Sequence, residues 1–137
     1  MKLYNLMINI FLKSKVIFYF INLFLYFLYF YPGSLIGLII YGNDNIQPQI
    51  TSDFVVSSNH FYMFVLVSVI GFLSFTDAKQ KKYLLIYLIF ISIFLELSHL
   101  IIPERNFQWS DLFGNLLGLI IVIFLKNLIS KYGSFKK

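Results

Sequence analysis

Long apolar runs separated by short polar segments organise the whole chain. At the length a lipid bilayer demands, such runs predict membrane-spanning helices, here at residues 16–31, 60–75, 83–102 and 111–129. A polar loop at residues 42–59 separates the first expected span from the second. We therefore expect a single all-α integral membrane domain over residues 1–137, built as a bundle of four transmembrane helices.

Two features near the start of the chain modify this expectation. Residues 2–15 place apolar side chains three and four positions apart, which predicts an N-terminal amphipathic segment at the membrane surface. Pro32 and Gly33 interrupt an apolar run that continues to Tyr41, and a proline ring is incompatible with a regular helix interior. We expect a break at Pro32 and leave open whether residues 33–41 continue the span or lie in the interface. The Phe and Tyr residues of the first span are expected to contact lipid.

The composition favours a membrane protein. Hydrophobic residues make up 59% of the chain and charged residues only 12%, whereas soluble domains carry about 25% charged residues. A chain of this length cannot bury so many apolar side chains in one core. The composition therefore excludes a soluble enzyme and a nucleic-acid-binding domain. The absence of cysteine excludes disulfides and thiolate ligands.

The positive charges predict an orientation. Of the 11 cationic residues all but Arg105 are lysines, and these lie at the two ends of the chain and in the loop after Phe75. Lysine and arginine concentrate in cytoplasmic loops, so both termini are expected in the cytoplasm. The excess of Phe, Ile, Asn and Lys over Ala and Arg is typical of an AT-rich bacterial genome. We therefore expect a multi-pass protein of the bacterial cytoplasmic (inner) membrane.

Polar residues that are unusual in membrane spans collect at the expected outer ends of the helices. They are His60, Glu96, His99, Arg105, Asp111 and Asn115. An ionisable side chain at the centre of a span costs at least about 2.5 kcal/mol, so its presence indicates function by default. We expect these residues to form one outward-facing polar cluster that binds a ligand.

Arg105 and a pair of glycines suggest how this cluster is held together. Arg105 is the only arginine, and we expect it to pair with Glu96 or Asp111. Gly114 and Gly118 form a GxxxG pair, which lets another helix approach closely.

None of the known catalytic motifs considered assigns a reaction to this sequence. The chain lacks a glycine-rich phosphate loop, a nucleophile elbow and an HExxH motif. Glu96 and His99 form one ExxH pair, whereas di-iron bundles use two with further glutamates. A zinc site of His60, His99 and a carboxylate lacks a recognised spacing. We therefore expect no metal and no cofactor, and the catalytic residues stay unknown.

The order of these residues resembles that of the VanZ-like membrane proteins. The resemblance rests on His60-Phe61, Glu96, His99, Pro103, Arg105, Asp111, Asn115 and Gly118. The chain differs in carrying His99 where the family often has Gln, and in lacking a lysine shortly before His60. The resemblance implies a place in the cell envelope, and teicoplanin resistance in some members, without an established reaction.

Three functions remain open. In the first, the polar cluster binds the headgroup of a lipid or of a cell-wall precursor. In the second, the chain is an enzyme that acts on a lipid-linked phosphate substrate. In that case Glu96 or His60 would be the general acid–base, and Arg105 would bind the phosphate. The third is an accessory subunit that offers Gly114 and Gly118 to a larger membrane complex. The expected partners are membrane lipids, the headgroup ligand and a membrane protein, and no nucleic acid.

Overall fold

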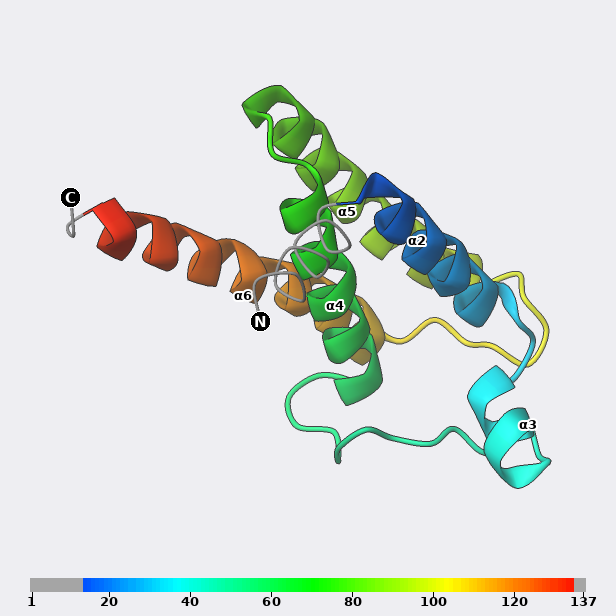
Figure 1. Ribbon diagram of the computed structural model, residues 1–137. Helices are drawn as coiled ribbons and strands as arrows, with labels where there is room; N and C mark the ends of the chain where they lie inside the picture. The colour runs from blue at the N-terminus through cyan, green and yellow to red at the C-terminus, as the bar shows by residue number, and fades with distance from the viewer. Residues whose placement is uncertain (1–13, 135–137) are drawn as a thin grey trace, which may run out of the picture.

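The computed structural model describes residues 14–134, whose regular secondary structure is all α-helix (Figure 1). The helices are α2 (Lys15–Phe30), α3 (Leu35–Tyr41), α4 (Ser58–Ser74), α5 (Ala78–Ser98) and α6 (Trp109–Ser134). The expected amphipathic segment at residues 2–15 lies outside the described residues except for its last two positions.

The expected break at Pro32 is confirmed. Helix α2 ends at Phe30, and α3 leaves it at an angle of 85°. Gly33 adopts φ +76° in the turn, and a Cβ there would lie 3.0 Å from the carbonyl oxygen of Asp44. Ser34 then caps α3, because its hydroxyl oxygen accepts a hydrogen bond from the N–H of Gly37 at 3.0 Å. The residues after the break therefore form a separate short helix.

The core lies where α2, α4, α5 and α6 meet. Its most deeply buried side chains are Leu25, Phe64, Val67, Leu88, Ile91 and Leu95. Helix α6 packs closely on α4, because Gly114 and Gly118 face the α4 backbone. A Cβ at Gly118 would lie 2.5 Å from the carbonyl oxygen of Phe61, and one at Gly114 would lie 2.8 Å from that of Ser57. Both glycines are thus used inside this chain and are not free for an accessory-subunit contact.

The expectation of a bundle of four transmembrane helices is wrong. Within the described residues only Trp109–Tyr132 of α6, with 24 residues and a mean hydropathy of 2.2, is by itself long and apolar enough to cross a membrane. Helices α2 and α4 have 16 and 17 residues, which corresponds to about 24–26 Å against a hydrocarbon core of about 30 Å. Helix α5 carries three lysines and Glu96. The bent pair of α2 and α3 could supply at most one further span.

The arrangement of the helices also differs from a parallel bundle. Figure 1 shows the C-terminal half of α6 standing clear of the other helices. The side chains from Phe124 to Tyr132 are accordingly exposed, apart from the half-buried Leu128. Helix α6 thus contributes to the core with its residues up to Ile123. The part after Ile123 is mainly exposed, although Nζ of Lys126 lies 4.7 Å from the centre of the Phe72 ring.

Candidate functional site

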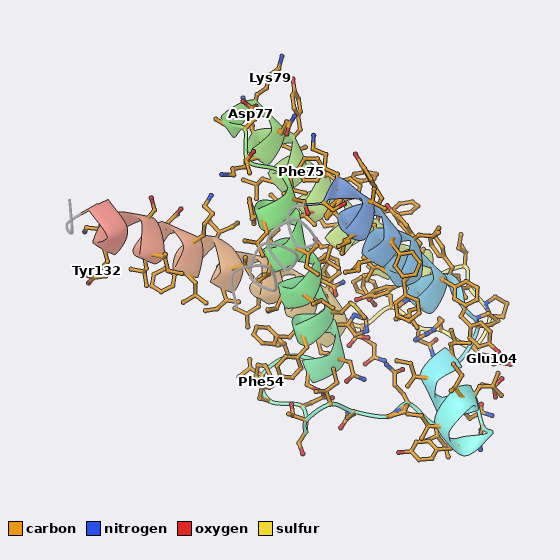
Figure 2. All side chains as sticks on the ribbon, viewed as in Figure 1. Phe54, Phe75, Asp77, Lys79, Glu104 and Tyr132 are labelled. Atoms are coloured by element: carbon orange, nitrogen blue, oxygen red, sulfur yellow. The ribbon has the colours of Figure 1, made fainter. Side chains whose placement is uncertain are left out.

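A cluster of buried polar side chains lies at one end of the core, where α2, α4, α5 and α6 converge. The polar cluster, as we use the term, consists of Tyr29, His60, Glu96, His99, Asp111 and Asn115. Figure 2 shows Glu104, from the loop that follows α5, on this side of the molecule, and Asp77 and Lys79 at the far end. The structure therefore brings together all the expected polar residues except Arg105, which lies at the edge, and adds Tyr29.

His60 is the centre of the polar cluster. Its Nδ1 lies 3.0 Å from the hydroxyl of Tyr29 and 3.2 Å from Oδ1 of Asn115. Its Nε2 lies 3.4 Å from Oδ2 of Asp111. The imidazole therefore connects α2, α4 and α6. Its Nδ1 is closest to neutral polar groups, with Oε2 of Glu96 farther away at 3.9 Å, and its Nε2 faces the carboxylate of Asp111.

The start of α4 is fixed by the preceding loop, and this places His60. The Ser58 N–H donates a hydrogen bond to Oδ1 of Asp53 at 2.9 Å. The Asn59 side-chain amide donates to the carbonyl of Pro48 at 2.7 Å. His60 follows directly, so these two side chain–backbone bonds fix the backbone position from which its ring extends into the polar cluster.

Glu96 and His99 make a close but incompletely bonded pair. Oε1 of Glu96 accepts a hydrogen bond from the backbone N–H of Gln108 at 2.8 Å. Oε2 of the same carboxylate has no hydrogen-bond partner among the described residues. The histidine nitrogens near it are Nδ1 of His99 at 3.4 Å and Nδ1 of His60 at 3.9 Å. Glu96 itself is 0% exposed, so one oxygen of a fully buried carboxyl group lacks a hydrogen bond.

Asn115 connects the polar cluster to α5. Its Oδ1 accepts a hydrogen bond from the Tyr29 hydroxyl at 2.7 Å, and its side-chain amide donates to the carbonyl of Ser92 at 3.2 Å. The ring of Tyr29 also stacks on His99, with the centroids 5.7 Å apart and the planes 20° from parallel. Tyr29 and Asn115 thus hold the two histidines in place.

Tyr29 is the cluster residue that the sequence analysis missed. We expected the aromatic side chains of the first helix to contact lipid, and for Tyr29, which is 6% exposed, this is wrong. The buried positions of α2 are Phe18, Asn22, Leu25 and Tyr29. Their spacing of four, three and four is that of one helix face. A polar Asn22 on that face was the available sign that it points into the protein.

Arg105 binds backbone carbonyls instead of the expected carboxylates. Its Nε donates to the carbonyl of Tyr31 at 3.2 Å, and its Nη2 donates to the carbonyl of Leu28 at 3.0 Å. No ion pair joins Arg105 to a carboxylate within residues 14–134, so the expected pairing with Glu96 or Asp111 is wrong. Both carbonyls belong to the C-terminal end of α2, where helix carbonyls lack intrahelical partners and the helix dipole favours a cation.

Arg105 retains binding capacity at the cluster edge. A guanidinium has five N–H donors, and the two bonds to α2 use one on Nε and one on Nη2. Burial lowers the pKa of Arg105 below its ordinary value, while the nearby Tyr29, Asp111 and Glu96 act in the opposite direction. The remaining donors are available to an anion.

Two cavities adjoin the polar cluster and meet at Arg105. The larger, about 270 Å³, is mainly apolar, with walls that include Leu28, Leu35, Ile36, Ile40 and Met63. The smaller, about 170 Å³, is polar, with walls that include Asp44, Glu104, Asn106, Gln108 and Asp111. The residues that line both are Ser34, Gln47, His99 and Arg105. An apolar cavity and a polar cavity therefore lie side by side, with Arg105 in the wall of both.

A set of three side chains in the polar cluster has the composition of a metal site. His60, Glu96 and Asp111 each offer one ligand atom, and these atoms lie within 4.8 Å of one another. The three residues come from three different helices, so no short sequence motif could have indicated them. The sequence analysis accordingly expected no metal.

Comparisons of the chain with protein-family models, with curated proteins and with solved structures found no match. The resemblance to the VanZ-like proteins is not tested by them and stays a prediction.

Proposed function

We propose that the chain is a membrane protein of the bacterial cell envelope, similar to the VanZ-like proteins, that binds the headgroup of an amphiphilic molecule. The ligand is a lipid or a lipid-linked cell-wall precursor. The observation that carries this proposal is the junction of an apolar and a polar cavity at Arg105. An acyl or prenyl chain fits the first cavity, and a headgroup fits the second.

The charged residues that line the polar cavity limit which headgroups it can bind. Arg105 can bind a phosphate with its free donors, since a guanidinium matches phosphate geometry. Asp44, Glu104 and Asp111 line the same cavity and would repel a ligand that is only anionic. Carboxylates accept hydrogen bonds from hydroxyl or ammonium groups. The ligand therefore combines a phosphate with hydroxyl or amine donors, as phosphatidylethanolamine and sugar-bearing lipid phosphates do.

Direct lipid binding tests this proposal. Native mass spectrometry of the detergent-purified chain would compare phosphatidylethanolamine with phosphatidylcholine, whose headgroup nitrogen cannot donate. Phosphatidylethanolamine is expected to be retained more strongly, and Arg105→Gln to weaken its binding by about tenfold, the effect of losing one charge-assisted hydrogen bond. A sugar phosphate on a shortened polyprenyl chain, added in competition, shows whether the protein prefers a cell-wall precursor or a phospholipid as its ligand.

Two variants control the lipid experiment. Lys79→Gln removes one positive charge at the far end of the molecule (Figure 2) and should leave binding unchanged. Arg105→Lys keeps the charge but loses the planar fork, so an intermediate affinity is expected. Because Arg105 also binds the end of α2, thermal unfolding of each variant is measured alongside. A folded Arg105→Gln variant that binds as wild type does would refute the proposal.

The proposed location follows from α6 and the exposed apolar side chains. The apolar side chains that are more than half exposed on α2 include Val16, Phe20, Leu23 and Phe27. An apolar surface of this kind is covered by lipid or by another protein. In our proposal α6 and the bent α2–α3 pair each cross the bacterial cytoplasmic membrane. The lysine-rich ends then face the cytoplasm, and the polar cluster faces outward.

Cysteine labelling tests this orientation, since the chain has no cysteine of its own. Asn106→Cys, beside the polar cavity, should react with a membrane-impermeant thiol reagent in intact cells. Lys131→Cys, near the other end of α6, should react only after permeabilisation. Both positions are exposed, so the opposite pattern would reverse the proposed orientation.

The contact between His60 and Asp111 favours an enzyme as the second candidate. An imidazole oriented by a carboxylate can transfer protons, and the pair lies between the two cavities. On this alternative the substrate is a lipid-linked phosphate. Release of inorganic phosphate from a short-chain lipid phosphate, lost in His60→Gln, would favour the enzyme over a binding protein.

A further inference from the structure

The carboxylates of the polar cluster lack a permanent positive partner. Glu96 and Asp111 have side chains 0% and 14% exposed. Within residues 14–134 no lysine or arginine lies within ion-pair distance of either one. Among the basic side chains of these residues, only histidine rings lie within ion-pair distance of the two carboxylates. Buried carboxylates are normally paired with a cation or coordinate a metal, so the charge of this cluster calls for a positive group.

The hydrogen bonds of His60 indicate which of its nitrogens is free to bind a ligand. The Tyr29 hydroxyl donates to Oδ1 of Asn115, so the oxygen atoms of both residues can accept a bond from Nδ1–H of His60. This places the proton on Nδ1 and leaves a lone pair on Nε2. That lone pair faces Oδ2 of Asp111 at 3.4 Å. Histidines that bind metals use this arrangement, donating from one nitrogen and coordinating through the other.

Glu96 supplies the second, independent sign. Its Oε2 is fully buried and has no hydrogen-bond partner among the described residues. His99 approaches this oxygen with Nδ1, while its Nε2 lies 3.2 Å from the carbonyl of Tyr29. A neutral His99 that donates from Nε2 thus presents a lone pair to Glu96 and cannot bond to it. Three acceptor groups, from His60, Glu96 and Asp111, therefore converge, and no donor within hydrogen-bond distance reaches Oε2 of Glu96 among the described residues.

We propose that Nε2 of His60 and the carboxylates of Glu96 and Asp111 bind a divalent transition-metal ion of the Zn²⁺ type. In a tetrahedral zinc site with ligands at about 2.1 Å, neighbouring ligand atoms lie roughly 3.4 Å apart. The His60–Asp111 distance already has this value. One candidate ligand atom from each of the three residues lies within 4.8 Å of the other two. The His60 nitrogen now nearest to Oε2 of Glu96 is Nδ1, at 3.9 Å, so binding through Nε2 requires a rotation of the Glu96 side chain toward that nitrogen.

The number of protein ligands indicates a metal site that keeps one coordination position free, unlike a purely structural site. Three protein ligands leave a fourth position for water or for an oxygen of a bound molecule. Asp111 also lines the polar cavity, so that position opens toward the proposed headgroup space. Tyr29, Asn115 and His99 hold the ligands in place and are positioning residues. The metal proposal rests on contacts inside the polar cluster and does not require headgroup binding.

Calorimetric titration with ZnCl₂ tests the site in the full chain, purified in detergent and treated with a chelator. One Zn²⁺ per chain is expected. Glu96→Gln and Asp111→Asn should each weaken binding by about 100-fold or more, since loss of an outer-shell partner alone costs about 10–100-fold. Glu104→Gln removes a carboxylate that lines the same polar cavity but lies outside the ligand set, and it should bind Zn²⁺ as wild type does.

Two further measurements separate loss of metal from loss of fold. Zn²⁺ should raise the unfolding temperature of the wild type and of Glu104→Gln but not that of Asp111→Asn. Co²⁺ in place of Zn²⁺ should give the visible absorption bands of tetrahedral coordination. Failure of the wild type to bind Zn²⁺, or equal weakening in Glu104→Gln, would overturn the metal site. Lipid binding that persists in that case would leave the proposed function intact.

Discussion

Two networks of buried and half-buried polar side chains join the helices of this protein, one between α2 and α5 and the other around His60. In the first, the side-chain amide of Asn22 donates to the carbonyl of Phe18 at 3.0 Å, and the Tyr87 hydroxyl donates to Oδ1 of Asn22 at 2.6 Å. The hydroxyl of Tyr26 lies 3.0 Å from that of Tyr87. All these groups are neutral, and each has a partner.

The polar cluster contrasts with that network in both charge and bonding. It contains two carboxylates, and its histidine–carboxylate contacts range from 3.4 to 3.9 Å. Oε2 of Glu96 has no hydrogen bond among the described residues. A fully satisfied neutral network stabilises a fold, whereas an unsatisfied buried group calls for a separate explanation. The difference teaches that the first network holds α2 to α5 with all its groups bonded, whereas the second leaves one buried carboxylate oxygen unbonded, and for this reason we propose a ligand there.

The largest expected effect comes from separating the helices that carry the polar cluster. Gly118→Ala would place a Cβ 2.5 Å from the carbonyl oxygen of Phe61 and push α6 away from α4. We expect a stability loss of about 1–3 kcal/mol together with loss of Zn²⁺ binding, because His60 and Asp111 lie on the two separated helices. Denaturant unfolding in detergent and zinc titration measure the two effects.

Leu117→Ala is the matched control for the glycine variant. Leu117 neighbours Gly118 but is 38% exposed, so its truncation should leave α4 and α6 in contact. If Gly118→Ala retained wild-type zinc affinity, the close approach of these two helices would not be what assembles the polar cluster.

Removing one hydroxyl from each network compares them directly. Tyr29→Phe and Tyr87→Phe should each cost about 1–2 kcal/mol of stability, because each removes a hydrogen bond to a buried amide oxygen, that of Asn115 or that of Asn22. Only Tyr29→Phe should also weaken Zn²⁺ binding, by about 10–100-fold, since Tyr29 orients His60. The same unfolding and titration experiments apply, and equal zinc affinities in the two variants would remove the distinction between the networks.

The smallest effect is expected outside both networks. Asp77 caps α5, since its Oδ1 accepts a hydrogen bond from the N–H of Gln80 at 3.1 Å. Asp77→Ala should cost about 0.5–1 kcal/mol, as loss of an N-cap does, and should change neither zinc nor lipid binding. Thermal unfolding and both binding assays check this, and a binding change here would mean that the far end of α5 is coupled to the polar cluster.

Apolar runs in the sequence mark where the main helices lie, but not how they are used. The break at Pro32 follows from local chemistry and was predictable. The four-span expectation failed because an apolar run reports helix position, whereas spanning also requires enough length and few charges. Helices α2 and α4 are too short, and the lysines of α5 lie inside the helix instead of preceding it.

The polar cluster was predictable where local spacing determines which face a residue occupies. Glu96 and His99 share a face, as do Asp111 and Asn115, so their convergence follows from helix periodicity. Tyr29 required knowledge of which face of α2 is buried. The contacts of Arg105 join it to residues 74 and 77 positions away. No short-range sequence pattern predicts which partners an arginine binds over such a separation.

The break after α2 also bears on which positive group can contact the carboxylates of the polar cluster. In a continuous helix the carbonyl of Leu28 would accept from the N–H of residue 32, and proline has none. Arg105 supplies the missing donor. The only guanidinium of the chain thus bonds to backbone oxygens at the end of α2 and forms no ion pair with Glu96 or Asp111 within residues 14–134. In the metal site that we propose, a cation from solution supplies the direct positive contact that Arg105 does not make with these carboxylates.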